Sequence, residues 1–143
     1  MAGLYDQDFY AWTQEQAALL KEGRLSVLDV EHLAEELEGM GKSERRELVN
    51  RLAVLLAHLL KWQHQPVRRG RSWRATITEQ RYRVQDRLEE SPSLQHDMDD
   101  SMARAYRYAV LQAIRETGLA EDSFPDRCPY TLAQALAHDF WPD

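Results

Sequence analysis

The residues in this chain that are best suited to chemistry are arginines and tryptophans around one short loop. Guanidinium groups form paired hydrogen bonds with phosphate oxygens, and aromatic rings stack on the bases of single-stranded nucleic acid. Arginines near the start of a helix also lie close to unpaired backbone N–H groups, which attract anions. The stretch therefore indicates an anion-binding or partner-binding surface. Its candidate residues are Trp62, Arg68, Arg69, Arg71, Trp73 and Arg74.

The positive charge of the chain is concentrated around this loop. Between Lys61 and Arg87 there are eight Lys or Arg residues and only two acidic ones, a net charge of +6. Because the whole chain has a net charge of −6, the remainder carries −12. Three arginines are expected to crowd the start of a helix capped by Ser72, where the helix dipole disfavours cations unless an anion is nearby.

Two kinds of anion could satisfy these arginines. The first is internal and consists of the carboxylates of Glu35, Glu36 or Glu38, from the same chain or from a second subunit. The second is an external phosphate or nucleic acid. We favour internal pairing, because the acidic stretch is rich in carboxylates and is already tethered.

Two triplets of a histidine and two acidic residues have a spacing that could bind a metal. Each places its side chains at i, i+3 and i+4, on one face of a helix. In carboxylate-bridged metal bundles the ligands project into the core, whereas both triplets here lie opposite the apolar stripe of their own helix. We therefore expect them to face water, and we predict no metal and no cofactor. The triplets are His32, Glu35, Glu36 and His96, Asp99, Asp100.

No residues suggest nucleophilic catalysis or nucleotide binding. Cys128, the single cysteine, has no histidine near it in sequence that could act as a base, which predicts an unreactive, partly buried thiol. The glycine-containing segments, GMGKS among them, fail the spacing of phosphate-binding loops. The sequence assigns no catalytic residue and favours a non-catalytic protein, with an enzyme of another type in third place.

The stretch from Ser43 to Gln65 predicts the innermost helix. Its apolar side chains cover more than half of the helix circumference, so other helices must surround it. Ser43 is a suitable N-cap, and Pro66 cannot continue the helix. A DNA-binding helix-turn-helix is disfavoured, because this helix would have to leave the core and enter the major groove.

Cap and stop residues predict the other helices around this one. Asp29 caps a brief helix with an apolar stripe, and Gly39 and Gly41 end it. Together the segments predict an all-α protein, residues 1–143 forming a single compact helical bundle of five main helices plus a short C-terminal helix. The stripe of the brief helix is Val30, Leu33, Ala34 and Leu37. The remaining helices are expected from Gln7 to Glu22 after an Asp6 cap, from Trp73 to Glu90, from Ser91 or Ser93 to Thr117, and from Thr131 to about Phe140.

Length and composition are consistent with one helical domain. A chain of 143 residues buries enough surface to fold without disulfides or metal. The start of the chain, MAGLYDQDFYAW, has no basic region followed by an apolar run, which predicts a cytoplasmic protein. The longest apolar run, Leu52 to Leu60, is far shorter than the ~20 residues that span a bilayer, so no membrane association is expected.

Several blocks of the sequence resemble one known family. They are YDQDFYAWTQEQAALL, LAEELEGMGKSERREL, HLLKWQHQP, RSWRATITEQR, SPSL, CPYTLAQAL and DFWP. In this order and spacing, from Tyr5 to Pro142, they resemble the bacterial family of the domain of unknown function twenty-nine. The resemblance implies a compact, all-helical, single-domain bacterial protein. It implies no activity and supplies no catalytic or binding residues.

Two hypotheses about function follow. The first is a non-catalytic helical module that self-associates or binds another protein. The alternative is nucleic-acid or phosphate binding through the Arg-rich loop and helix at residues 68–87. Nucleic-acid affinity should fall steeply with salt, whereas an apolar protein interface should not.

Overall fold

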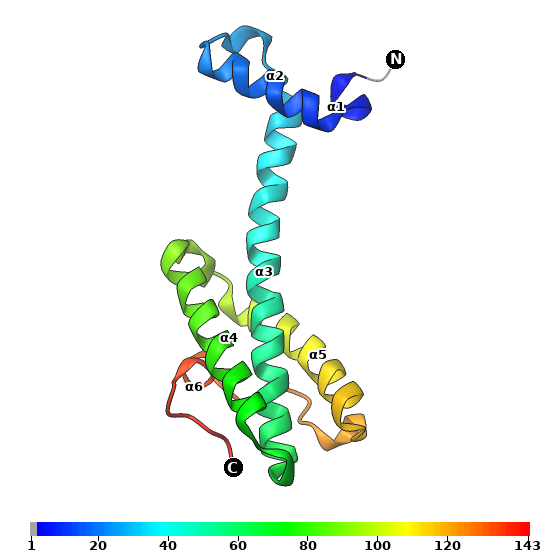
Figure 1. Ribbon diagram of the computed structural model, residues 1–143, viewed down its shortest axis with the longest axis vertical. Helices are drawn as coiled ribbons and strands as arrows, with labels where there is room; N and C mark the ends of the chain where they lie inside the picture. Colours follow the sequence, from blue (N-terminus) through cyan, green and yellow to red (C-terminus); the bar gives the residue numbers. More distant parts are fainter. Residues whose placement is uncertain (1–2) are drawn as a thin grey trace. The chain divides into compact units, whose positions relative to one another are not determined.

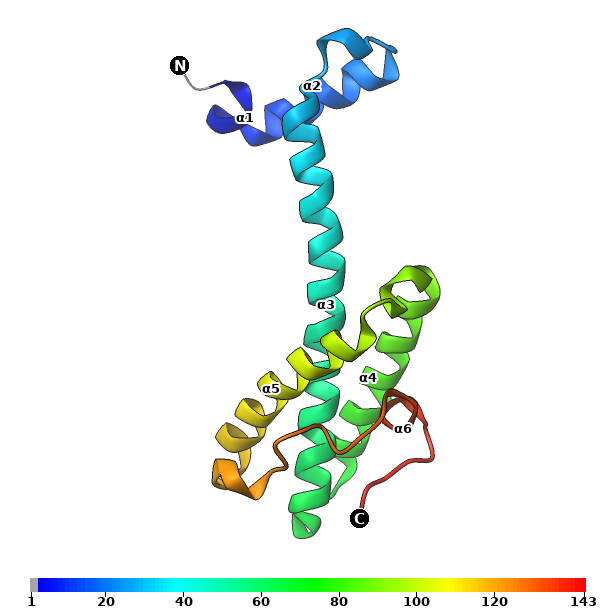
Figure 2. The ribbon, with the colours of Figure 1, turned by 180° about the vertical axis from the view of Figure 1, so that it is seen from behind.

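The computed structural model describes residues 3–143 and confirms the predicted all-α helical bundle. Among these residues there are six α-helices and no strand (Figures 1 and 2). Four helices are long: α2 (Phe9–Lys21), α3 (Val30–His64), α4 (Arg71–Glu90) and α5 (Met98–Thr117). Two are short, α1 (Leu4–Gln7) and α6 (Leu132–Leu136), and 3-10 turns lie at Leu25–Val27, Pro66–Arg68, Pro92–Gln95 and Glu121–Ser123. No helix in the described part of the chain is both long and apolar enough to cross a membrane.

Contacts divide the chain into two compact units, an N-terminal unit up to Ser43 and a C-terminal unit, Glu44–Asp143. Helix α3 contributes its first part to the N-terminal unit and the rest to the C-terminal unit. The single domain expected for residues 1–143 stays a prediction.

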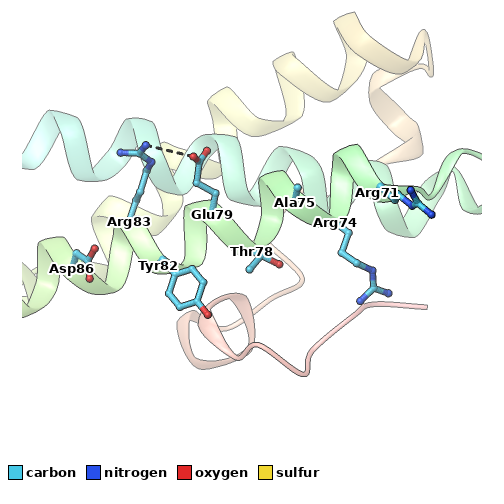
Figure 3. Close-up of a pocket in the computed structure, with 8 residues that line it drawn as sticks. All are labelled: Arg71, Arg74, Ala75, Thr78, Glu79, Tyr82, Arg83 and Asp86. Carbon is cyan, nitrogen blue, oxygen red and sulfur yellow. Dashed lines mark hydrogen bonds and ion pairs between the residues drawn. The ribbon is translucent and has the colours of Figure 1, made fainter.

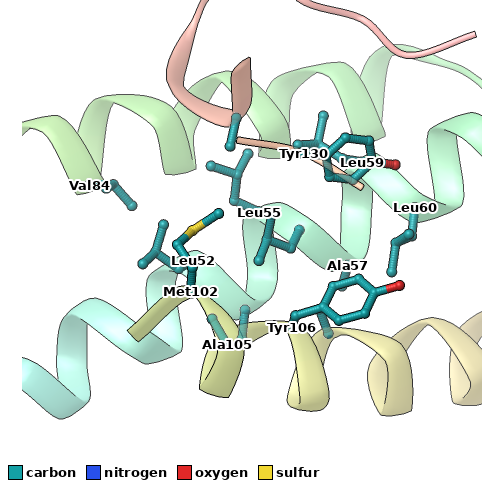
Figure 4. Close-up of a cluster of buried hydrophobic side chains, with 14 of the residues drawn as sticks. Leu52, Leu55, Ala57, Leu59, Leu60, Val84, Met102, Ala105, Tyr106 and Tyr130 are labelled. Atoms are coloured by element: carbon teal, nitrogen blue, oxygen red, sulfur yellow. The ribbon is translucent and has the colours of Figure 1, made fainter. Parts of the chain in front are cut away.

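The core of the C-terminal unit is built around α3, as predicted. The side chains of Leu52, Leu56 and Leu59 are fully buried. Helices α4 and α5 pack beside this part of α3, and the segment around α6 packs against α4 (Figures 2 and 4). The apolar side chains that surround α3 include Ile77, Val84, Met102, Ala105, Tyr106, Ala109, Phe124, Tyr130 and Ala135.

One continuous helix replaces the two that the sequence predicted around Gly39 and Gly41. Neither glycine has a positive φ, and both lie inside α3. A glycine ends a helix when it adopts the left-handed conformation, and the helix-forming residues around these two keep the helix intact. The predicted stops at Gly39 and Gly41, and the cap at Ser43, are therefore wrong.

Three other helix starts also differ from the prediction. The side chain of Asp8, rather than Asp6, accepts the capping hydrogen bond, from the Ala11 N–H at 3.0 Å. Helix α4 begins at Arg71 after an extended Gly70, so Ser72 is not its cap. Helix α5 begins only at Met98, because Pro92–Gln95 form a 3-10 turn and Asp97 is left-handed.

Two predicted helix ends and one start are confirmed. Gly23 and Gly118 have φ values of 72° and 75° at the ends of α2 and α5. Thr131 and Gln134 form the capping box that starts α6. Helix α6 stops at Leu136, however, short of the predicted end near Phe140.

Candidate interaction surfaces

The N-terminal unit is held together by a cluster of aromatic and polar side chains around Tyr5. The Tyr5 ring stacks on His32, with ring centres 3.9 Å apart, and meets the Trp12 ring edge-on at 4.8 Å. The Tyr5 hydroxyl donates a hydrogen bond to Glu36 Oε1. This bond to a carboxylate is the main reason that the pKa of Tyr5 rises to about 12. We call Tyr5, Trp12, Asp29, His32 and Glu36 the Tyr5 cluster.

Asp29 is the polar centre of the Tyr5 cluster. Its Oδ2 accepts the Trp12 Nε1–H at 3.0 Å and lies 2.7 Å from His32 Nδ1. The backbone N–H of Asp29 donates to Gln16 Oε1 at 2.8 Å. The hydrogen bond between the Asp29 and His32 side chains lowers the pKa of Asp29 and raises the pKa of His32. The pair therefore favours a carboxylate facing an imidazolium.

The Tyr5 cluster reverses the predicted orientation of α3 in this unit. His32 and Glu36 were expected to face water, but they are partly buried against Tyr5. Val30 and Leu37 were expected to pack, but their side chains are 67% and 65% exposed. A helix can pack only one side against α1 and α2, and the aromatic rings of those helices contact the polar side.

The outward side of α3 forms an apolar face with a regular spacing. Val30, Leu33, Leu37 and Met40 follow one another at intervals of three and four residues, the spacing of a helix–helix seam. Met40 is 64% exposed. We define the apolar face as Val30, Leu33, Ala34, Leu37, Met40 and Gly41.

Exposed apolar side chains are concentrated in the N-terminal unit as a whole. Among residues 3–143, nine of the thirteen large hydrophobic side chains that stand exposed belong to this unit. Exposed apolar side chains that gather on one part of a protein mark an interaction site more often than a single exposed leucine does. The nine are Leu4, Phe9, Tyr10, Leu20, Leu25, Val27, Val30, Leu37 and Met40.

Two of the predicted site arginines contact tryptophans of their own chain. Arg69 Nε donates to the Trp62 carbonyl oxygen at 2.6 Å, and its guanidinium lies 5.3 Å from the centre of the Trp62 ring. The Arg74 guanidinium lies over the Trp141 ring at 4.4 Å and near the Trp62 ring at 5.4 Å. Only 7% of Trp62 is exposed. Trp62 is therefore part of a cation–π cluster and has little free surface for a nucleic-acid base.

The other predicted site residues lie in different surroundings. The Trp73 ring is partly buried and is covered by Lys61 Nζ at 4.8 Å. Arg68 and Arg71 are exposed, and no hydrogen bond or ion pair of either is present among the described residues. Their pairing with Glu35, Glu36 or Glu38 stays a prediction.

Arg81 is an anchoring residue that the sequence did not reveal. It is fully buried, and it donates to the backbone carbonyls of Ala135 at 2.7 Å and Phe140 at 2.6 Å. Its guanidinium also lies 5.1 Å from the centre of the Trp141 ring. Burial lowers the pKa of Arg81. The sequence places Arg81 beside the apolar stripe of α4 but gives no sign that distant carbonyl groups would meet it there.

The exposed side of α4 forms a wide, shallow and open groove lined by arginines (Figure 3). It has a volume of about 690 Å³. Its Tyr82 ring is 56% exposed and lies 4.7 Å from the His138 ring. Arg83 pairs with Glu79 at 3.4 Å within the groove. We call this surface the arginine groove; its residues are Arg71, Arg74, Ala75, Thr78, Glu79, Tyr82, Arg83 and Asp86.

No metal-binding group of three or more His, Cys, Asp or Glu side chains comes together within residues 3–143. The Cys128 thiol is partly buried and donates to the Tyr130 carbonyl oxygen at 3.3 Å. Burial raises the pKa of this thiol, which keeps it in the less nucleophilic protonated form.

Comparison with known families identifies the chain. Residues 4–141 match the model of the domain of unknown function DUF29. The chain belongs to the DUF29 family. No curated protein and no solved structure shows significant similarity to this DUF29 protein. Because the family carries no assigned activity, the function must be argued from the surfaces described above.

Proposed function

We propose that this DUF29 protein is a non-catalytic protein-interaction module, and that its N-terminal unit is the docking surface. The observation that carries the proposal is the orientation of α3. Its polar side packs inside the unit, while Val30, Leu37 and Met40 point outward.

The energetics of this orientation favour a partner. Burying a Val, Leu or Met side chain completely is worth roughly 1.5–3 kcal/mol. Three such side chains on one helical stripe, each about two-thirds exposed, leave several kcal/mol of apolar burial available to another protein. The polar side of α3, in contrast, already has hydrogen-bond partners within the Tyr5 cluster.

The experiment introduces one charge on the apolar face and a matched charge elsewhere. Leu37→Glu should abolish association, because a carboxylate would have to be buried in an apolar contact. Leu111→Glu is the control, because Leu111 is 50% exposed on α5 in the C-terminal unit. The protein is purified from its own host under mild conditions, and the species that co-purify are identified and compared. Equal association of the two variants would contradict the proposal.

A second candidate function is anion binding through the arginine groove. The supporting observation is that three arginines, Arg71, Arg74 and Arg83, line one side of α4 beside the exposed Tyr82 ring. Binding of single-stranded nucleic acid should then weaken steeply as salt rises, and it should weaken in Arg71→Ala. Affinity that is unaffected by salt would contradict this candidate.

A further inference from the structure

We propose that the partner is a second copy of this chain, and that the apolar face of one copy lies in the arginine groove of the other. This inference rests on the proposed function, because it names the partner of the same surface. It also assigns the arginine groove to protein contact rather than to a free anion.

The distribution of charge disfavours the simplest alternative, in which two apolar faces meet each other. Residues 1–43 contain three basic and nine acidic residues, a net charge of −6. This equals the net charge of the whole chain, so residues 44–143 are neutral overall. Two N-terminal units in contact would bring two strongly negative surfaces together, and juxtaposed like charges oppose association. A surface on the C-terminal unit carries no such penalty.

The charged rims of the two proposed surfaces follow a complementary order. The charged residues beside the apolar face begin with the acidic Glu31 and end with Lys42, whereas the groove starts with Arg71 and Arg74, continues through the paired Glu79 and Arg83, and ends with Asp86. If α3 of one copy runs parallel to α4 of the other with Glu31 level with Arg71, acidic residues face arginines at one end, and Lys42 lies one helical turn before Asp86 at the other. The acidic residues nearest the apolar face are Glu31 and Glu38, and the arginines are Arg71 and Arg74.

The groove is long enough to take the apolar face. The stretch from Glu31 to Lys42 rises about 16 Å along its helix, and the groove from Arg71 to Asp86 extends over about 22 Å. Between Arg74 and Arg83 the groove is lined by the small side chains of Ala75 and Thr78, by the exposed ring of Tyr82, and by Glu79, which pairs with Arg83. Aliphatic side chains such as Val30 and Leu37 can pack there without burying an unpaired charge.

The glycines of α3 supply an independent argument. A glycine inside an exposed helix destabilises it relative to alanine. A Cβ added at Gly39 or Gly41 would meet no atom within 4 Å, so no close contact within the described chain requires either glycine. Gly41 lies on the apolar face, whereas Gly39 lies on the opposite side of α3. At Gly41 the missing side chain allows the backbone of another helix to approach closely.

The glycines provide a matched pair of variants. Gly41→Ala and Gly39→Ala each remove one glycine from the same helix, so each should raise the melting temperature. Only Gly41→Ala should weaken self-association, by about tenfold in sedimentation equilibrium, because only its methyl group enters the contact. Equal dissociation constants for the two variants would overturn the proposed close approach.

Exchanging the charges of Glu31 and Arg71 tests whether the arginine groove is the surface that receives the apolar face. Glu31→Arg and Arg71→Glu should each weaken self-association by about tenfold, because each places like charges opposite one another. An equimolar mixture of the two variants should associate as strongly as the wild type, because both contacts of the mixed dimer again join opposite charges. Circular dichroism checks that each variant keeps its helical content. A mixture that associates no better than either variant alone would overturn the inference.

The failure of this inference can be told apart from the failure of the proposed function. If the wild type stays monomeric but binds a different protein through a surface that Leu37→Glu destroys, this inference is overturned and the proposed function stands. If Leu37→Glu alters neither self-association nor any other association, both are overturned. The expected result is a wild-type oligomer that Leu37→Glu dissociates, with a dissociation constant raised at least roughly 30-fold.

Discussion

The two units of this protein use the same helix in opposite ways. In the C-terminal unit α3 buries its leucines together with His58 and Lys61, while Glu44, Arg46 and Asn50 stay exposed. In the N-terminal unit α3 packs its polar side through the Tyr5 cluster and leaves its apolar side exposed. A helix that is folded through its polar side keeps its apolar side available to a partner. The contrast teaches that one unit is organised for stability and the other for contact.

The largest expected effect lies in the C-terminal core. Leu56→Ala should lower the free energy of unfolding by about 2–5 kcal/mol, because it removes buried methyl groups and leaves a cavity. Urea unfolding followed by circular dichroism measures this change. A loss below about 0.5 kcal/mol, as expected for a surface substitution, would contradict the claim that the C-terminal unit is organised for stability.

Arg81 gives a second large effect in the same unit. Arg81→Met should cost about 1–3 kcal/mol for each backbone carbonyl that is left unpaired, those of Ala135 and Phe140. The exposed Arg83, whose one ion pair within residues 3–143 is with Glu79, is the matched control, and Arg83→Met should change stability by less than about 1 kcal/mol. Urea unfolding compares the two. Equal losses would show that the buried guanidinium does not anchor the C-terminal segment.

The two units should respond to pH in opposite directions. The raised pKa of His32 means that its stabilising interaction with Asp29 is fully present below pH ~6.5 and is lost as pH rises through the pKa in the folded state. His58 and His64 have lowered pKa values because they are buried, so the C-terminal unit should gain stability as pH rises toward ~6.5.

Amide hydrogen exchange, corrected for the intrinsic effect of pH, measures the two trends separately. His32→Asn should remove the trend around Trp12 and leave the trend around His58 unchanged. If protection of both units changes in the same direction with pH, the assignment of these histidines is wrong. At low pH, the lowered pKa of Asp29 means that its contribution to the stability of the N-terminal unit is lost as pH falls below ~3.9 and through the pKa in the folded state.

The smallest effect should come from the apolar face itself. Leu37→Ala should change the stability of the monomer by less than about 0.5 kcal/mol, because the side chain is mostly exposed. The same variant should weaken association measurably, whereas Leu56→Ala should not do so at temperatures where it is folded. A large loss of monomer stability in Leu37→Ala would show that this side of α3 packs within the chain.

Much of the C-terminal unit could be predicted from the sequence. The run from Leu48 to Trp62 is so apolar that only an interior position suits it, and Gly118 and the Thr131–Gln134 box follow local backbone rules. Such features depend on residues close together in the chain. They are therefore visible before any tertiary contact is known.

The N-terminal unit was harder to predict, for a physical reason. The hydrophobic pattern of α3 correctly identifies two sides but assumes that the apolar one packs. Which side of α3 packs depends on Tyr5 and Trp12. The Tyr5 hydroxyl donates a hydrogen bond to Glu36, and the Trp12 indole N–H donates one to Asp29. Among the candidate site residues, Arg69 and Arg74 were assigned from their place in the loop near the expected start of a helix and close to tryptophans in the sequence. Their contacts with Trp62 and Trp141 arise from tertiary packing within the C-terminal unit.

Oxidation of two methionines tests the central claim most directly. Met40 is 64% exposed on the apolar face, whereas Met102 is 9% exposed in the C-terminal core, so the two report on opposite surroundings within one molecule. In dilute protein, peroxide should oxidise Met40 much faster than Met102, as followed by mass spectrometry. As the protein concentration rises, Met40 should become protected while Met102 stays equally slow. A Met40 oxidation rate as slow as that of Met102 at every dilution would contradict the account, and a fast Met40 rate that never changes with concentration would overturn the self-association.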